Sequence, residues 1–347
     1  MTTAQLGDLS TGMVWAAATV YTIALVAYTL DLARMVDRLP AARVAAAGVR
    51  SGGRATGTLV ADRGDRDGAT AAGGLGAGAG RVPGTAPGVG APGRRRSKAR
   101  GIARSTTTLG LVLHVVAVVA RGFAAGRAPW ANMYEFTLVG TLVAVVVLLA
   151  VLRRRDLPFL GVVVTGFAVL ALAAGLLVFF IQADGVQPAL DSYWLVIHVG
   201  VAITSTGVFT VACATSVLQL LRDSRGRGST ALAGRGWRWL EAVPRPTELE
   251  ALSFRLNAVG FVLWTFTLIA GAIWAEHAWG RYWGWDPKEV WTFVIWVVYA
   301  AYLHARTTRG WGGRRAAWFV LVGYACVLAN FTLVNMFFDG KHSYSGL

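Results

Sequence analysis

Five histidines are the residues of this chain whose side chains could bind a metal ion or a haem iron. His198 lies in the segment SYWLVIHVG, and His342 lies in DGKHSYSG. A neutral imidazole is a common ligand of haem iron, so two such residues on the same side of a membrane would suit a haem with two axial histidines. For either histidine alone, a hydrogen-bonded structural role is the commoner one.

The other three histidines have less obvious partners. His304, in AYLHAR, lies near the end of an apolar run, where an ionisable residue is a functional candidate. It could instead extend to the membrane surface beside Arg306. His114, in GLVLHVVAV, is either a second intramembrane ligand or a hydrogen bonder between helices, and we favour the latter. His277 adjoins a tryptophan-rich segment and could simply be solvated.

Tryptophan is concentrated in one part of the chain, since seven of the 14 tryptophans fall between residues 264 and 296. These are Trp264, Trp274, Trp279, Trp283, Trp285, Trp291 and Trp296. An interfacial aromatic belt accounts for one or two aromatic residues at each helix end. The connection from Trp279 to Trp285 holds four, so we expect a flat aromatic surface on which a planar apolar ligand could stack. Residues 274–291 are called the tryptophan loop below.

The segment DPKE inside the tryptophan loop has the form of a helix start. Asp286 is suited to the N-cap, Pro287 to the first helical position and Glu289 to the capping-box position. This structural role is at least as good an explanation of the two carboxylates as contact with a ligand. Lys288 does not fit the pattern, because the helix dipole disfavours a cation there. Its position hints at an anionic partner, such as a carboxylate, a propionate or a lipid phosphate.

The elements that must position these residues are membrane-spanning helices. The chain has 347 residues, 55% of them hydrophobic and only 15% charged, which is not the composition of a soluble domain. A spanning helix needs roughly 20 apolar residues. Eight stretches qualify: 12–31, 106–122, 135–152, 157–181, 193–221, 256–275, 288–306 and 315–337. We therefore predict an all-α polytopic membrane bundle of about eight transmembrane helices.

Arginine predicts the orientation of this bundle, because short basic connections tend to stay on the cytoplasmic side. Arginines cluster in 32–105, 153–155, 222–238 and 306–315, which all fall on one side. This alternation accounts for the net charge of +15 without nucleic-acid binding. It makes both termini, the tryptophan loop, His198 and His342 external. The cluster 94–104 could also bind anionic lipid head groups of the bilayer.

Three regions follow from this pattern. Residues 1–31 form the first transmembrane helix, 32–105 a cytoplasmic basic loop, and 106–347 a seven-helix core. The stretch 52–93 is rich in Gly, Ala, Pro and Arg, so we expect disorder there. Its GGLGAGAG lacks the strand and the GK[ST] of a phosphate loop.

Cys213 and Cys326 lie far apart in apolar runs, which excludes a disulfide framework and a thiolate metal site.

The segment WGRYWGWDPKEVW resembles the tryptophan-rich WWD signature of haem-handling proteins for cytochrome c maturation. The surrounding spans resemble the CcsA/ResC branch, also named CcsB, of the second cytochrome c assembly system. PWANMYEF at 129–136 is similar to this family's P-x-x-N-x-Y-E segment. SYWLVIHV, YLHAR and KHSYS hold histidines that match those of the family. The resemblance covers roughly residues 106–347.

The resemblance implies a membrane haem carrier, with haem b as ligand and substrate, and a component of a cytochrome c haem lyase. It implies that His198 and His342 are axial iron ligands beneath the tryptophan loop. His304 would serve a second haem position, with its other ligand from a partner subunit. The further haem-binding residues that we infer are Trp279, Trp283, Trp285, Asp286 and Trp291. No catalytic residue is indicated.

The implied partners are a cytochrome c biogenesis membrane subunit of the ResB or Ccs1 type, apocytochrome c with its CxxCH motif, and a thioredoxin-like thiol reductant. The implied location is the cell membrane. A b-type electron-transfer protein is the alternative, and it predicts histidine pairs that face each other at equal depth. A solute transporter would show broken helices or internal repeats, and neither is clear here.

Overall fold

The long apolar runs of this chain fold into helices, because a helix satisfies its backbone hydrogen bonds internally within lipid. A computed structural model describes residues 1–51, 98–185 and 192–342, with the backbone alone for 36–51. Residues Met1–Asp37 and Ser97–Leu347 form one compact unit, to which the description below applies, and Arg38–Arg96 form another.

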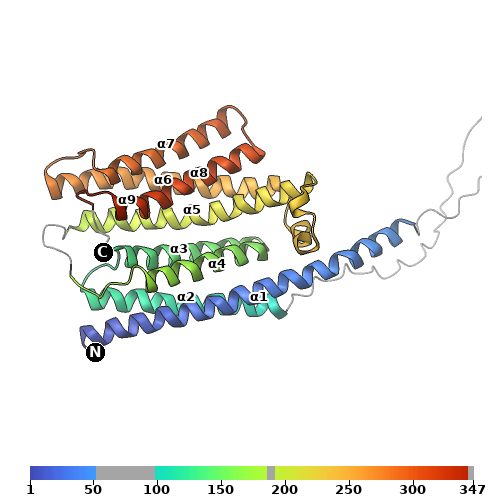
Figure 1. The fold of residues 1–347 in the computed structure, drawn as a ribbon, viewed down its shortest axis with the longest axis horizontal. Coiled ribbons are helices and arrows are strands. Elements are labelled where there is room, and N and C mark those ends of the chain that lie inside the picture. The colour runs from blue at the N-terminus through green and yellow to red at the C-terminus, as the bar shows by residue number, and fades with distance from the viewer. Residues whose placement is uncertain (52–97, 186–191, 343–347) are drawn as a thin grey trace, which may run out of the picture. The chain divides into compact units, whose positions relative to one another are not determined.

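The α-helices are α1 (Thr3–Ser51), α2 (Lys98–Ala125), α3 (Met133–Arg154), α4 (Pro158–Leu177), α5 (Tyr193–Gly226), α6 (Pro246–Trp279), α7 (Pro287–Thr308), α8 (Gly313–Phe331) and α9 (Leu333–Phe337) (Figure 1). Two short 3-10 turns, Thr230–Leu232 and Arg235–Ala242, lie between α5 and α6.

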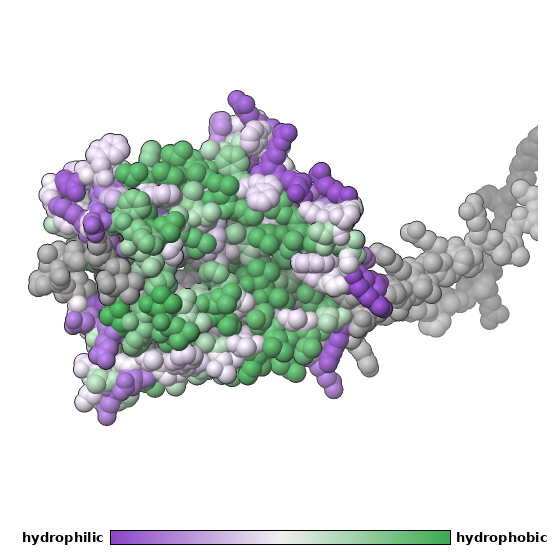
Figure 2. All heavy atoms as spheres, viewed as in Figure 1, coloured by the Kyte–Doolittle hydropathy of each residue, from purple (hydrophilic) through white to green (hydrophobic). Residues whose placement is uncertain are grey.

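The structure confirms the predicted all-α membrane bundle. Each of the eight predicted spans lies largely within one helix, with α8 and α9 together forming the last. Within the part of the chain that the structure describes, seven of these helical segments are long and apolar enough to cross a membrane. Helix α7 is not among them, and besides its aromatic residues it contains charged residues near both of its ends. The middle of the face in Figure 2 is accordingly covered by apolar residues, with hydrophilic residues at the two ends.

The first two helices extend further than the apolar pattern predicted. Helix α1 continues to Ser51 instead of ending near residue 31, because alanine, leucine and arginine are good helix formers. Helix α2 begins at Lys98, and Arg100 in its first turns binds Asp31 (2.9 Å) and Asp156. These ion pairs neutralise Arg100, so this basic segment is helical although its charge had suggested a loop. The predicted disordered stretch 52–93 lies outside the described residues.

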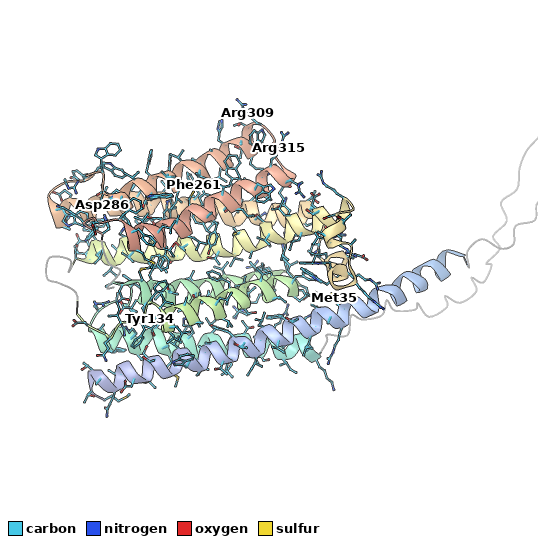
Figure 3. All side chains as sticks on the ribbon, in the orientation of Figure 1. Met35, Tyr134, Phe261, Asp286, Arg309 and Arg315 are labelled. Carbon is cyan, nitrogen blue, oxygen red and sulfur yellow. The ribbon has the colours of Figure 1, made fainter. Side chains whose placement is uncertain are left out.

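The helices run back and forth between two ends of the bundle. Asp286, in the tryptophan loop, lies at one end, and Arg309 and Arg315, which flank the α7–α8 connection, lie at the other (Figure 3). The tryptophan loop and this arginine-bearing connection are therefore separated by the length of α7.

Close packing joins α5, α6 and α7 around Phe209. A Cβ atom on Gly260 of α6 would lie 2.5 Å from the Phe209 ring, so only glycine lets α6 approach this closely. The Phe209 ring also stacks on Tyr299 of α7, with ring centroids 3.9 Å apart. This contact fixes the three helices that carry most of the candidate site.

Candidate functional site

A cavity of about 160 Å³ lies at the end of the bundle that carries the tryptophan loop. It is partly open and is lined by the α2–α3 connection, the start of α3, helices α5 to α9, the tryptophan loop and His342. Its lining includes Trp130, Asn132, His198, Trp264, Thr267, Gly271, Trp274, Tyr282, Trp283, Lys288, Glu289, Asn330, Asn335 and His342. The fold therefore brings His198 and His342, which are far apart in the sequence, to one mainly apolar and aromatic pocket.

His198 is held in one orientation by helix α6. Its Nδ1 lies 2.9 Å from the carbonyl oxygen of Thr267, and since a carbonyl only accepts, Nδ1 carries the proton. The lone pair available to a metal is then on Nε2. Gly271 allows this arrangement, because a Cβ atom there would lie 2.7 Å from His198 Cε1.

His342 is oriented in the same way by Asp286. Its Nδ1 donates to Asp286 Oδ1 at 2.9 Å, so Nε2 is again the nitrogen suited to a metal. The second oxygen of Asp286 accepts from the backbone N–H of Lys341 at 2.7 Å. Asp286 also caps α7 with Glu289 in the predicted capping box. One carboxylate thus joins the start of α7 to the segment that carries His342.

The Asp286 carboxyl is ionised near neutral pH. Burial raises its pKa, but the hydrogen bond and charge of His342 and the N–H groups of Lys288 and Lys341 lower it, to about 2 from 3.8. A lowered folded-state pKa stabilises the fold above pH 3.8, and this contribution is lost as the pH falls through about 2. Mild acidification therefore leaves this carboxylate charged.

Trp274 contacts both imidazoles. Its indole stacks on His198 with centroids 6.0 Å apart and meets the edge of His342 at 5.6 Å. The side chain is buried, and among the described residues its Nε1 has no hydrogen-bond partner. A buried donor without a partner is costly, so a ligand in the cavity could satisfy it.

The tryptophans that we predicted to bind haem lie in three kinds of position: lining the cavity, packed against His342, or outside the lining. Trp283 lines the cavity, and Trp279 packs against His342 with centroids 4.8 Å apart. Trp285 is 77% exposed and adopts a positive φ of 59°. Neither Trp285 nor Trp291 lines the cavity. The roles predicted for these residues toward haem stay predictions.

The remaining histidines lie away from the cavity. His304 is exposed and lies about 24 Å from Lys288 along α7, at 1.5 Å per residue, so the second haem position stays a prediction. His277 is exposed and bonds the Ile273 carbonyl. His114 is buried, and its Nδ1 lies 3.3 Å from Tyr21 Oη on α1. This contact supports the predicted bond between helices, not the facing histidine pair of an electron-transfer protein.

Several lining residues were not predicted from the residues alone. Trp130 and Asn132 precede α3, and Asn330 and Asn335 lie near the end of the chain. The two later asparagines interrupt an apolar run, and polar residues within membrane helices are a signal of function. Asn132 was found only within the PWANMYEF resemblance. In the structure it is the N-cap of α3, and its side chain accepts from the Glu135 N–H at 2.9 Å.

A buried ion cluster holds the connection that carries Trp130. Glu135 is fully buried and binds Arg121 at 2.9 Å and Arg127 at 2.6 Å. The same arginines donate to the carbonyls of Ile181 and Asp184 after α4. The cluster therefore ties together the ends of α2, α3 and α4 beside the cavity.

We expect Glu135→Gln to destabilise the protein by about 3–5 kcal/mol, because it leaves buried guanidinium groups without their counter-charge. Chemical unfolding of the purified protein in detergent measures this loss. The matched control is Glu248→Gln, which breaks an exposed pair with Arg245 and should cost about 1 kcal/mol or less. Equal losses in the two variants would contradict the importance given to the cluster.

The part of the chain that forms the cavity is similar in sequence to a known protein family. The sequence model of the family described as "Cytochrome C assembly protein" matches residues 130–342, a range that begins and ends at residues lining the cavity. The chain belongs to this cytochrome c assembly family.

Relatives in the cytochrome c assembly family cover most of the chain. It is 34% identical over 263 residues to "Cytochrome c biogenesis protein CcsA" of Synechococcus sp. (strain CC9605), covering 70% of this chain and 86% of the relative. The protein of the same name from Parasynechococcus marenigrum (strain WH8102) is 35% identical over 269 residues, with coverages of 72% and 88%.

A solved structure shares the fold. The chain titled "Cytochrome c Heme Lyase CcmF" superposes with a TM-score of 0.58 at 17% identity. The match covers 96% of the present chain but 47% of the other, so the chain spans about half the length of that protein.

Proposed function

We propose that this chain binds haem b in the cavity and presents it for covalent attachment to apocytochrome c. The observation that carries the proposal is the pair His198 and His342, which line one apolar cavity with each Nδ1 bonded so that Nε2 is the metal-binding nitrogen. Membership of the cytochrome c assembly family supports it. Haem would be the substrate, and His198 and His342 would hold its iron within an aromatic lining.

The attachment reaction needs partners, which we also propose. Each thioether forms when a cysteine S–H of the CxxCH motif adds across a haem vinyl group, so the cysteines must be reduced. Cys213 and Cys326 of this chain pack within α5 and α8 among aromatic residues, away from the cavity lining. A thioredoxin-like reductant and a membrane subunit of the ResB or Ccs1 type would complete the lyase complex.

We further propose that the tryptophan loop faces the outside of the cell membrane. The arginine-bearing α7–α8 connection lies at the opposite end of the bundle, and basic connections favour the cytoplasm. Trp285→Cys, made in a chain that carries Cys213→Ser and Cys326→Ser, should react with a membrane-impermeant maleimide in intact cells. Arg309→Cys in the same chain should react only after permeabilisation. The reverse labelling pattern would refute this orientation.

The test of the proposed function is the haem content of the purified chain with its partner subunit. Trp274→Ala and Trp283→Ala should lower haem retention, because each removes an aromatic wall of the cavity. Trp318→Ala is the matched control, since Trp318 is 53% exposed on α8 and does not line the cavity. A purified complex without haem, or equal retention in all three variants, would count against the proposal.

A further inference from the structure

Among the described residues that line the cavity there is one lysine, Lys288, and its side chain bonds an amide oxygen. Lys288 lines the cavity at the first turn of α7, and its Nζ donates to Asn335 Oδ1. Among the described residues, this ammonium group forms no ion pair, although the charge of the nearby Asp286 acts on it. Placing a cation in a mainly apolar pocket and at a helix N-terminus is unfavourable on both counts.

The two nearby carboxylates are engaged elsewhere. Asp286 accepts from His342 and from the N–H groups of Lys288 and Lys341. Glu289 also lines the cavity, but its Oε2 accepts from the N–H groups of Gly284 and Asp286. Asp286 and the Oε2 atom of Glu289 are thus held by the turn that begins α7, and the ammonium bonds the Asn335 amide. Among the described residues, Glu289 Oε1 is buried and has no hydrogen-bond partner.

We propose that Lys288 is a carboxylate-binding residue of the cavity and takes a propionate of the haem. This inference rests on the proposed function. Haem b is a flat apolar ring with two propionates on one edge and its vinyl groups elsewhere on the ring. The pocket has aromatic walls and holds the Lys288 ammonium beside the Glu289 carboxylate. A charge-assisted hydrogen bond from this ammonium to a propionate would be stronger than its present bond to the Asn335 amide. Lys288 would then set which edge of the ring enters first.

The experiment compares haem with haem dimethyl ester, which has the same ring and iron but no carboxylates. Binding of each to the purified complex is followed by the Soret band. Wild type should bind haem about tenfold or more tightly than the ester, as expected for a charge-assisted hydrogen bond. Lys288→Gln should remove most of this preference by weakening haem binding alone, and Lys288→Arg should restore part of it.

Lys98→Gln is the matched control, because Lys98 begins α2 and does not line the cavity. Equal affinities for haem and ester in wild type would overturn the inference, including in the case that an anionic lipid pairs with Lys288. Equal weakening of both ligands by Lys288→Gln would also overturn it. If wild type binds neither ligand with histidine ligation, the proposed function itself fails. The wild-type comparison needs no variant, so it stands even if Lys288→Gln does not fold.

Discussion

His198→Gly and His342→Gly should each abolish the six-coordinate spectrum of haem bound to the purified complex. Each substitution removes one of the two imidazoles that line the cavity and leaves space of the same shape. Added imidazole can enter that space, so the six-coordinate signal should return in both variants. Cytochrome c maturation in cells should fall in both, because an iron with one ligand missing is poorly held and open to side reactions.

His277→Gly is the matched control, since His277 is exposed and bonds a carbonyl of its own helix. Glycine inside α5 costs about 1 kcal/mol of helix stability, so unfolding of His198→Gly must be measured alongside its spectrum. If both variants keep the wild-type spectrum and maturation, these histidines are not the ligands. Loss of the signal without rescue by imidazole would show a structural defect instead.

Asp286→Ala should lower haem affinity about 10–100-fold, although Asp286 does not line the cavity. The substitution removes the acceptor that orients His342 and the anchor of the Lys341 N–H. It also removes the N-cap of α7, which costs about 1 kcal/mol. The measurements are haem titration for affinity and chemical unfolding for stability.

Asp286→Asn separates these two roles, because asparagine is a good N-cap but a neutral and weaker acceptor for His342. It should keep most of the stability and still lose affinity. Asp339→Asn, at an exposed position nearby in the sequence, is the control. A haem affinity that follows only the stability of the variants would mean that Asp286 acts through the helix alone.

Much of the fold was predictable, because a long apolar segment within lipid must satisfy its backbone hydrogen bonds internally and therefore forms a helix. The start of α7 was predictable as well, since Asp286, Pro287 and Glu289 form a local signal that needs no distant contact. The ends of α1 and α2 were not. Their arginines suggested a solvated loop, whereas Arg100 is paired with Asp31, which is 69 residues away in the sequence.

The sequence predicted the two histidines that line the cavity, but not most of the residues around them. The distribution of arginine predicted that His198 and His342 lie on the same side of the membrane. In the structure both line one cavity. Trp130 and Asn335 line the same cavity from distant helix ends, and no spacing rule connects them. The hydrogen bond from His342 to Asp286 was likewise invisible, because the capping pattern already accounted for the carboxylate.

Gly271 determines how the His198 ring is placed, although it has no side chain and does not react itself. The His198 ring fills the space where a side chain on Gly271 would begin, so the separation of α5 and α6 at that level is set by an imidazole. A single added methyl group would push the ring off the Thr267 carbonyl and alter how its Nε2 points. The orientation of the His198 imidazole is thereby set by the neighbouring helix, at a position that carries no side chain.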